Sequence, residues 1–222
     1  MKKKTFVMAG ILTLSIVLYS CGGGGSKNNN DTTIKAETIT PEAQELKEFM
    51  LGGMYFVNGY GGISTVESMI PASDDTKEMV DAYRQIFLFP FQPEQGSDIK
   101  KMFSNMWDVN NKADLNKVMI KLITTKDASN PHKAWDYARV ANNACMGYAA
   151  GYLSKEEAKK YIKEAFAKAQ KEFKTWREYL TDYNAGRVTW DPKSDDKKAF
   201  DEVTAGLTKN PKGIYQLLPL NN

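Results

Sequence analysis

From Thr40 onward, apolar residues recur every three or four positions, and no stretch shows sustained alternation of apolar and polar residues. The longest periodic run begins after Ser154 and reaches Tyr183, and Gly186 is expected to end it. A helix returns to the same face every 3.6 residues and a strand every second residue, so this spacing predicts an all-α fold. Residues 41–222 can form one substantial core. We therefore expect a single compact domain of about six to eight helices.

Local motifs predict where several helices begin. Thr40-Pro41 offers an N-cap followed by proline at the first helical position, and Ser73 could cap the second helix. Ser154 and Glu157 have the spacing of a capping box. Gly52-Gly53 interrupts the first helical pattern, where glycine is unfavourable, which indicates a close approach of another helix.

Small residues mark a central helix. A segment that starts near Asn130-Pro131 is rich in alanine and contains Gly147, so neighbouring helices can pack closely against it. Gly151 is expected to end this helix in a left-handed conformation. A last helix is predicted over Asp195–Leu207.

The first twenty residues have the organisation of an export signal. Lys2–Lys4 form a cationic start, and the apolar run Phe6–Leu18 is too short to span a membrane as a helix. The following Leu18-Tyr-Ser-Cys21 resembles the lipobox of bacterial lipoproteins, with Tyr19 departing from the small or branched residue usual at that position. The resemblance implies that residues 1–20 are a lipoprotein signal peptide and that Cys21 becomes the lipidated, palmitate-bearing N-terminus.

Residues 21–40 are polar and rich in glycine and asparagine, with little apolar surface to bury, so they are predicted to form a flexible tether. A chain of this length has a root-mean-square reach of roughly 25 Å. The expected location is therefore outside the cytoplasm, lipid-anchored to the cell membrane or the outer membrane. Gly22 after the cysteine, by resemblance to lipoprotein sorting rules, favours the outer membrane.

The charge balance argues against nucleic acid as a partner. The whole chain has a formal charge of +3, but residues 1–20 hold three lysines and no acidic residue. Without them, 27 basic and 27 acidic side chains remain. Proteins that bind nucleic acid normally carry a basic surface, so we expect none to be bound.

Few residues are available for metal or nucleophilic chemistry. The chain has two cysteines and one histidine, and lipidation of Cys21 would leave Cys145 without a disulfide partner. We therefore expect no metal and no cofactor. His132 could act as a general base, although an exposed histidine is the preferred interpretation, and Cys145 among small apolar residues is expected to be an inert core thiol. Glu156 and Glu157 could be read as a pair of catalytic carboxylates, but the capping box already accounts for Glu157.

Several motifs occur in the order found in a known bacterial family. They are the runs Trp107–Asn111, Ala134–Arg139, Gly147–Tyr152, Thr175–Tyr179, Asp182–Arg187 and Leu207–Pro219, with Asp114-Leu115, Ser154, Glu156-Glu157 and Trp190. Together they resemble the domain-of-unknown-function family 1266 (DUF1266) over roughly residues 46–220. Thr175 stands where the family usually has serine, and Tyr215 and Leu220 where it often has tryptophan. The resemblance implies a fold and candidate positions but no reaction.

One group of residues could bind an anion. Asp136 and Arg139 share a helix face, and Arg187 could reach the same region, so two guanidinium groups could hold a phosphate or carboxylate. Four aromatic residues could line a ligand groove: Trp176, Tyr179, Tyr183 and Trp190. The preferred alternatives are a buried ion-pair network for the charged residues and core packing for the aromatic ones.

The leading functional hypothesis is a non-enzymatic, membrane-tethered helical domain that binds a protein partner or small ligand in the cell envelope. A second hypothesis is an enzyme that acts on an anionic small molecule through Asp136, Arg139 and Arg187. A third is an immunity-like protein that protects against a toxin.

Overall fold

The computed structural model describes residues 39–194, 197–210 and 213–221. Within these ranges it is all-α, which confirms the predicted class, and the only β pairing is an isolated bridge between Asp127 and Asn130. The predicted signal peptide, Cys21 and nearly all of the predicted tether lie outside the described residues. The helices are α1 Pro41–Phe49, η1 Met50–Gly52, α2 Gly53–Gly59, α3 Ile63–Met69, α4 Thr76–Phe87, η2 Pro93–Gln95, α5 Gly96–Trp107, α6 Lys112–Thr124, α7 Lys133–Ala149, α8 Lys155–Glu172, α9 Trp176–Trp190, α10 Lys197–Lys209 and α11 Ile214–Leu217.

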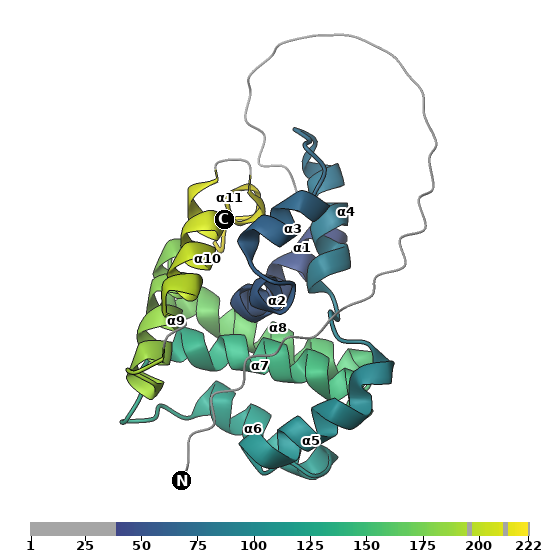
Figure 1. Cartoon of the computed structure of the whole chain (residues 1–222), viewed down its shortest axis with the longest axis vertical. Helices are drawn as coiled ribbons and strands as arrows, with labels where there is room; N and C mark the ends of the chain where they lie inside the picture. Colours follow the sequence, from purple (N-terminus) through teal and green to yellow (C-terminus); the bar gives the residue numbers. More distant parts are fainter. Residues whose placement is uncertain (1–38, 195–196, 211–212, 222) are drawn as a thin grey trace.

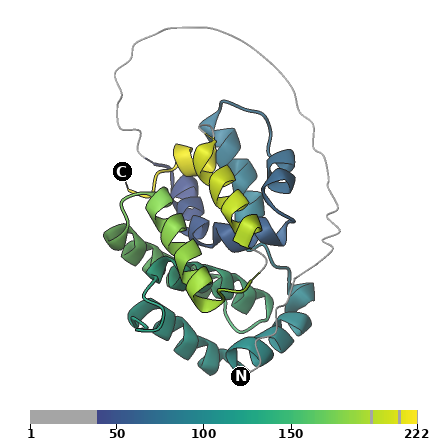
Figure 2. The ribbon, with the colours of Figure 1, turned by 60° about the vertical axis from the view of Figure 1, so that its left-hand side comes forward.

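The alanine-rich helix α7 is the centre of the domain, as predicted. It packs against α6, α8, α9 and η1, and it is buried around most of its circumference. Figure 1 shows α7 and α8 crossing the middle of the molecule, with α5 and α6 below and α1–α4 above. Figure 2 brings α9 and α10 forward as a separate flank. The small side chains of α7 allow this central position, because the backbones of neighbouring helices can approach α7 closely from several directions.

Glycines permit the closest approaches between helices. A Cβ atom on Gly53 would clash with the hydroxyl of Tyr215, and one on Gly52 would lie 3.2 Å from Cβ of Ala141. The predicted close approach at this glycine pair is therefore confirmed. Gly186 serves the same purpose between α9 and α7, since a Cβ there would lie 2.7 Å from Cβ of Trp135.

Several predicted helix ends are also confirmed. The Thr40 hydroxyl accepts a hydrogen bond from the Ala43 amide, and Ser154 and Glu157 form both hydrogen bonds of a capping box. Gly151 has φ 72°, the left-handed conformation expected after a helix. These features involve residues within a few positions of one another, which is why the sequence reports them directly.

Other boundaries were predicted wrongly. The long periodic run after Ser154 is two helices, because Thr175 caps α9 and its hydroxyl accepts from the Glu178 amide. Gly186 lies inside α9 and does not end it. The second predicted helix is capped by Asp75 in place of Ser73, and a 3₁₀ turn divides the first at the glycine pair. Helical periodicity persists across such short interruptions, so it overestimates helix length.

Candidate functional site

Asp136 lies at the centre of a buried ion cluster at the start of α7. One of its carboxylate oxygens accepts a hydrogen bond from Nζ of Lys133 at 2.8 Å, and the other pairs with the guanidinium of Arg139. Asp136 is 6% exposed and Lys133 is 4% exposed. Lys133 was not among the predicted members, and it gives the Asp136 carboxylate a second cationic partner beside Arg139.

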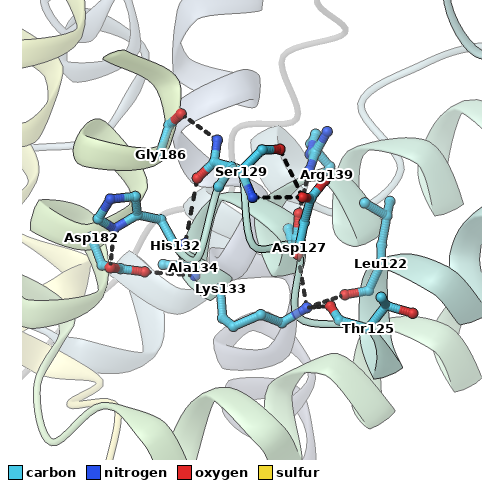
Figure 3. Close-up of polar contacts among 12 residues, drawn as sticks. Leu122, Thr125, Asp127, Ser129, His132, Lys133, Ala134, Arg139, Asp182 and Gly186 are labelled. Carbon is cyan, nitrogen blue, oxygen red and sulfur yellow. Dashed lines mark hydrogen bonds and ion pairs between the residues drawn. The ribbon is translucent and has the colours of Figure 1, made fainter. Parts of the chain in front are cut away.

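Lys133 also joins two helices. Its ammonium donates to the carbonyl oxygens of Leu122 at 2.6 Å and Thr125 at 3.0 Å, as Figure 3 shows. These carbonyls belong to the C-terminal end of α6, where backbone acceptors have no partner within their own helix. The cluster therefore supplies hydrogen bonds to the carbonyl groups at the end of α6 and holds that end against the first turn of α7.

Aromatic rings cover Arg139. Its guanidinium carbon lies 3.7 Å from the ring centroid of Trp135 and 5.5 Å from that of Trp107. The ring of Trp190 packs in turn on Trp135, with centroids 5.8 Å apart. The structure thus brings Asp136, Arg139 and Trp190 into one neighbourhood, with Trp135 and Trp107 as the connecting residues that the sequence analysis did not single out.

Arg187 makes different contacts. Its guanidinium carbon lies 4.3 Å from the ring centroid of Phe200, and it donates to the hydroxyl of Ser194 at 3.4 Å. Burial raises the pKa of the Tyr55 hydroxyl, while the charges of Arg139 and Arg187 both oppose the rise. The two arginines therefore lie near Tyr55, and Asp136 pairs with Lys133 and Arg139.

Trp176 is a core residue and lies far from Trp190. It begins α9 and Trp190 ends it, which separates them by about 21 Å along the axis. Its indole N–H donates to the carbonyl of Leu218 at 2.8 Å, and its ring packs edge-on against Tyr215 with centroids 5.2 Å apart. Trp176 therefore fastens the C-terminal segment and does not share a groove with Trp190.

The sequence analysis missed the partner of His132. Nδ1 of His132 lies 2.7 Å from one oxygen of Asp182, whose other oxygen accepts from the Ala134 amide at 2.9 Å. Figure 3 shows this pair joining the start of α7 to α9. The partners are 50 residues apart and no local pattern links them. The arrangement orients the imidazole, as in a catalytic dyad, and it also ties two helices together.

Replacing Asp182 with asparagine is expected to lower the free energy of unfolding by about 1–2 kcal/mol. The neutral amide has one acceptor oxygen in place of two, so it can serve both Ala134 and His132 only when Nδ1 of His132 is unprotonated and accepts from the amide NH2 group. The charge-assisted hydrogen bonds of the carboxylate are lost, and partial solvent exposure limits the loss. Urea unfolding followed by circular dichroism measures the change. Glu202→Gln is the control, because that exposed ion pair with Lys198 should contribute less than about 0.5 kcal/mol. Equal effects of the two substitutions would contradict a joining role.

A hollow of about 380 Å³ lies away from these residues. Ligand sites usually occupy about 300–1,000 Å³, so this one has room for a small molecule. It is formed where α1, α4, the segment between α4 and η2, α7 and α8 meet. Its lining residues are Glu45, Arg84, Leu88, Phe89, Phe91, Gln92, Pro93, Tyr148, Lys155 and Lys159. None of them was predicted as a site residue, because they come from four α-helices and one connecting segment that lie far apart in sequence.

Glu45 holds two of the three cationic side chains in the lining. Its carboxylate oxygens lie 2.8 Å from the Arg84 guanidinium and 2.6 Å from Nζ of Lys159. Burial raises the pKa of Glu45, but the hydrogen bonds from Lys159 and Arg84 outweigh it and bring the pKa below its usual value. Glu45 therefore stays ionised at neutral pH and is unsuited to act there as a general acid.

Lys155 and two aromatic rings form another part of the lining. Nζ of Lys155 lies 5.4 Å from the ring centroids of both Phe89 and Tyr148, and these rings pack edge to face with centroids 4.9 Å apart. Phe89 has φ 52°, a left-handed conformation that is strained for a bulky residue. Its ring also packs against Phe49, which helps to hold it in place.

Comparison with known proteins identifies the family. The family described as "Protein of unknown function (DUF1266)" matches residues 63–220, so α1, η1 and α2 precede the matched range. A 64-residue stretch is 34% identical to "Uncharacterized protein YbeR" of Escherichia coli (strain K12), which is 29% of this chain and 27% of that protein. No solved structure gives a significant match. The chain belongs to the DUF1266 family.

Proposed function

We propose that this protein is a lipoprotein of the cell envelope whose helical domain binds a small ligand or a partner without chemically changing it. The lipobox-like motif ending at Cys21 supports the anchor, and the polar composition of residues 21–40 supports a tether. None of the described helices is both long and apolar enough to cross a membrane. The family description and the similar protein from Escherichia coli carry no activity that could be transferred.

The hollow is the observation that carries the binding proposal. Aromatic side chains supply apolar contact and cationic side chains supply polar contacts, so the lining can hold a molecule that has both an apolar and a charged part. The lining contains no histidine, cysteine, serine or threonine. Its one carboxylate, on Glu45, is already bound to two cations. These features favour binding over acid–base or nucleophilic catalysis.

The alternative of an enzyme working through Asp136 has less support. A catalytic carboxylate must reach substrate, whereas Asp136 is buried and paired with Lys133 and Arg139. The described residues contain no group of three or more His, Cys, Asp or Glu placed to hold a metal ion. No contact specifically favours the immunity-like alternative.

The anchor can be tested by exploiting the two cysteines. Cells expressing the Cys21→Ala variant and fed labelled palmitate are expected to yield unlabelled protein that no longer fractionates with membranes. Cys145→Ala is the matched control and should keep both label and location. Cys145 is fully buried, and burial raises the pKa of its thiol, so it is a poor acylation site. Label retained in Cys21→Ala would refute the anchor.

A further inference from the structure

We infer that the hollow bounded by Phe89, Tyr148 and Lys155 binds a small anion that carries an aromatic or flat apolar body, such as an aryl phosphate or carboxylate. This inference rests on the proposed binding function and specifies the chemistry of the ligand. It assigns Lys155 as the main contact for the charge and the rings of Phe89 and Tyr148 as the contact for the body.

The charge of the lining favours an anion. Three cationic side chains, Arg84, Lys155 and Lys159, face the hollow against one carboxylate. Glu45 occupies Arg84 and Lys159. Among the described residues, no carboxylate lies within ion-pair distance of Lys155, so its ammonium is available to a ligand.

The contacts of Lys155 come from side chains and not from a helix end. Lys155 is the first residue of α8, but the capping box of Ser154 and Glu157 already uses amide groups at this end. An anion would therefore bind to the ammonium group, with its body against the aromatic wall. Lys155 itself lies over both rings, so the charge and the apolar body of a ligand would bind next to each other.

The aromatic wall is held in position before any ligand arrives. Phe89 keeps its strained backbone because its ring is packed between Phe49 and Tyr148, at 5.1 and 4.9 Å. The Phe89 backbone also lies close enough to the buried Cys145 thiol on α7 to oppose the rise that burial causes in its pKa. Aromatic side chains that are already held in place by packing lose little conformational freedom when a ligand binds, which favours affinity for a rigid flat molecule. Strained residues of this kind concentrate at binding sites.

The test uses two probes of similar shape and different charge. The purified full chain, in lipid nanodiscs when its lipid is attached, is titrated with 4-fluorophenyl phosphate and with neutral 4-fluorobenzyl alcohol. Fluorine NMR reports binding, and empty nanodiscs correct for partition into lipid. Inorganic phosphate serves as a competitor that lacks the apolar body. We expect the aryl phosphate to bind at least about tenfold more tightly than either the alcohol or inorganic phosphate.

Three variants separate charge from structure. Lys155→Gln is expected to weaken aryl phosphate binding about tenfold and leave the alcohol unaffected, whereas the exposed Lys160→Gln on the same helix should change neither. Glu45→Gln removes the competing carboxylate and frees Arg84 and Lys159, so it is expected to tighten binding by about threefold. A gain of binding cannot result from misfolding.

Three results would overturn the inference: no binding of the aryl phosphate, equal binding of the two probes, or no effect of Lys155→Gln. Equal binding that Tyr148→Leu weakens would still support a ligand site in the hollow, so the general binding proposal would stand while its anionic chemistry failed. The proposal that the protein is a lipoprotein of the cell envelope is tested by a different measurement. It fails if the Cys21→Ala variant still carries the palmitate label. The two failures are therefore distinguishable.

Discussion

Replacement of Asp136 by alanine is expected to lower the free energy of unfolding by about 3–5 kcal/mol. The substitution leaves the ammonium of Lys133 buried at 4% exposure without its counter-charge, and it removes the partner of Arg139. An unpaired buried charge costs much more than the pair itself contributes. Urea unfolding of the wild-type and variant chains, followed at 222 nm, measures the difference.

Asp98→Ala provides a matched control for this prediction. Asp98 and Lys101 have the same residue types and a three-residue spacing on a helix, but their side chains are 86% and 73% exposed. Loss of such a surface pair should change stability by less than about 1 kcal/mol. A small effect of Asp136→Ala, similar to that of Asp98→Ala, would argue against a structural cluster and would reopen the ligand-binding interpretation of Asp136.

Replacement of Trp176 by alanine is expected to have an effect of similar size, about 3–5 kcal/mol. The side chain is 3% exposed and packs against Phe166, Tyr179 and Tyr215. Its removal creates a cavity and leaves the Leu218 carbonyl without its hydrogen bond. The C-terminal segment should loosen first, so hydrogen exchange of the amides of α11 is expected to accelerate more than exchange in α7.

Trp190→Ala tests the other tryptophan of the predicted groove. Trp190 is 48% exposed and its ring packs at a tilt of 42° against that of Trp135, so its loss should cost about 1 kcal/mol. A cost for Trp190→Ala equal to that for Trp176→Ala would contradict the assignment of one residue to the core and the other to the surface. Unchanged exchange in α11 of the Trp176 variant would contradict its anchoring role.

Part of the fold was predictable because it depends on neighbouring residues. The caps at Thr40 and Ser154 and the left-handed Gly151 involve contacts within a few positions. The all-α class follows from apolar spacing summed over many turns. Thr175 and Glu178 also have N-cap spacing, which indicates the division between α8 and α9, but the apolar pattern continues across it.

The candidate sites were less predictable. The sequence correctly places Asp136 and Arg139 on one helix face, because residues three apart are neighbours there. The sequence gives no sign that the Lys133 ammonium binds a carbonyl group at the C-terminal end of α6. It also gives no sign that Asp182 binds His132, which lies 50 positions away. The hollow combines residues from Glu45 to Lys159, and the family match begins only at residue 63.

The sequence by itself determined the helical class, several helix ends, the family motifs and the prediction of a lipidated Cys21. All of these depend on short-range spacing or on ordered motifs along the chain. Only the tertiary structure decided which charges are paired and which side chains surround the hollow. The physical reason is that helix packing, set by close contacts such as Gly186 against Trp135, brings distant residues together in ways that local periodicity does not encode.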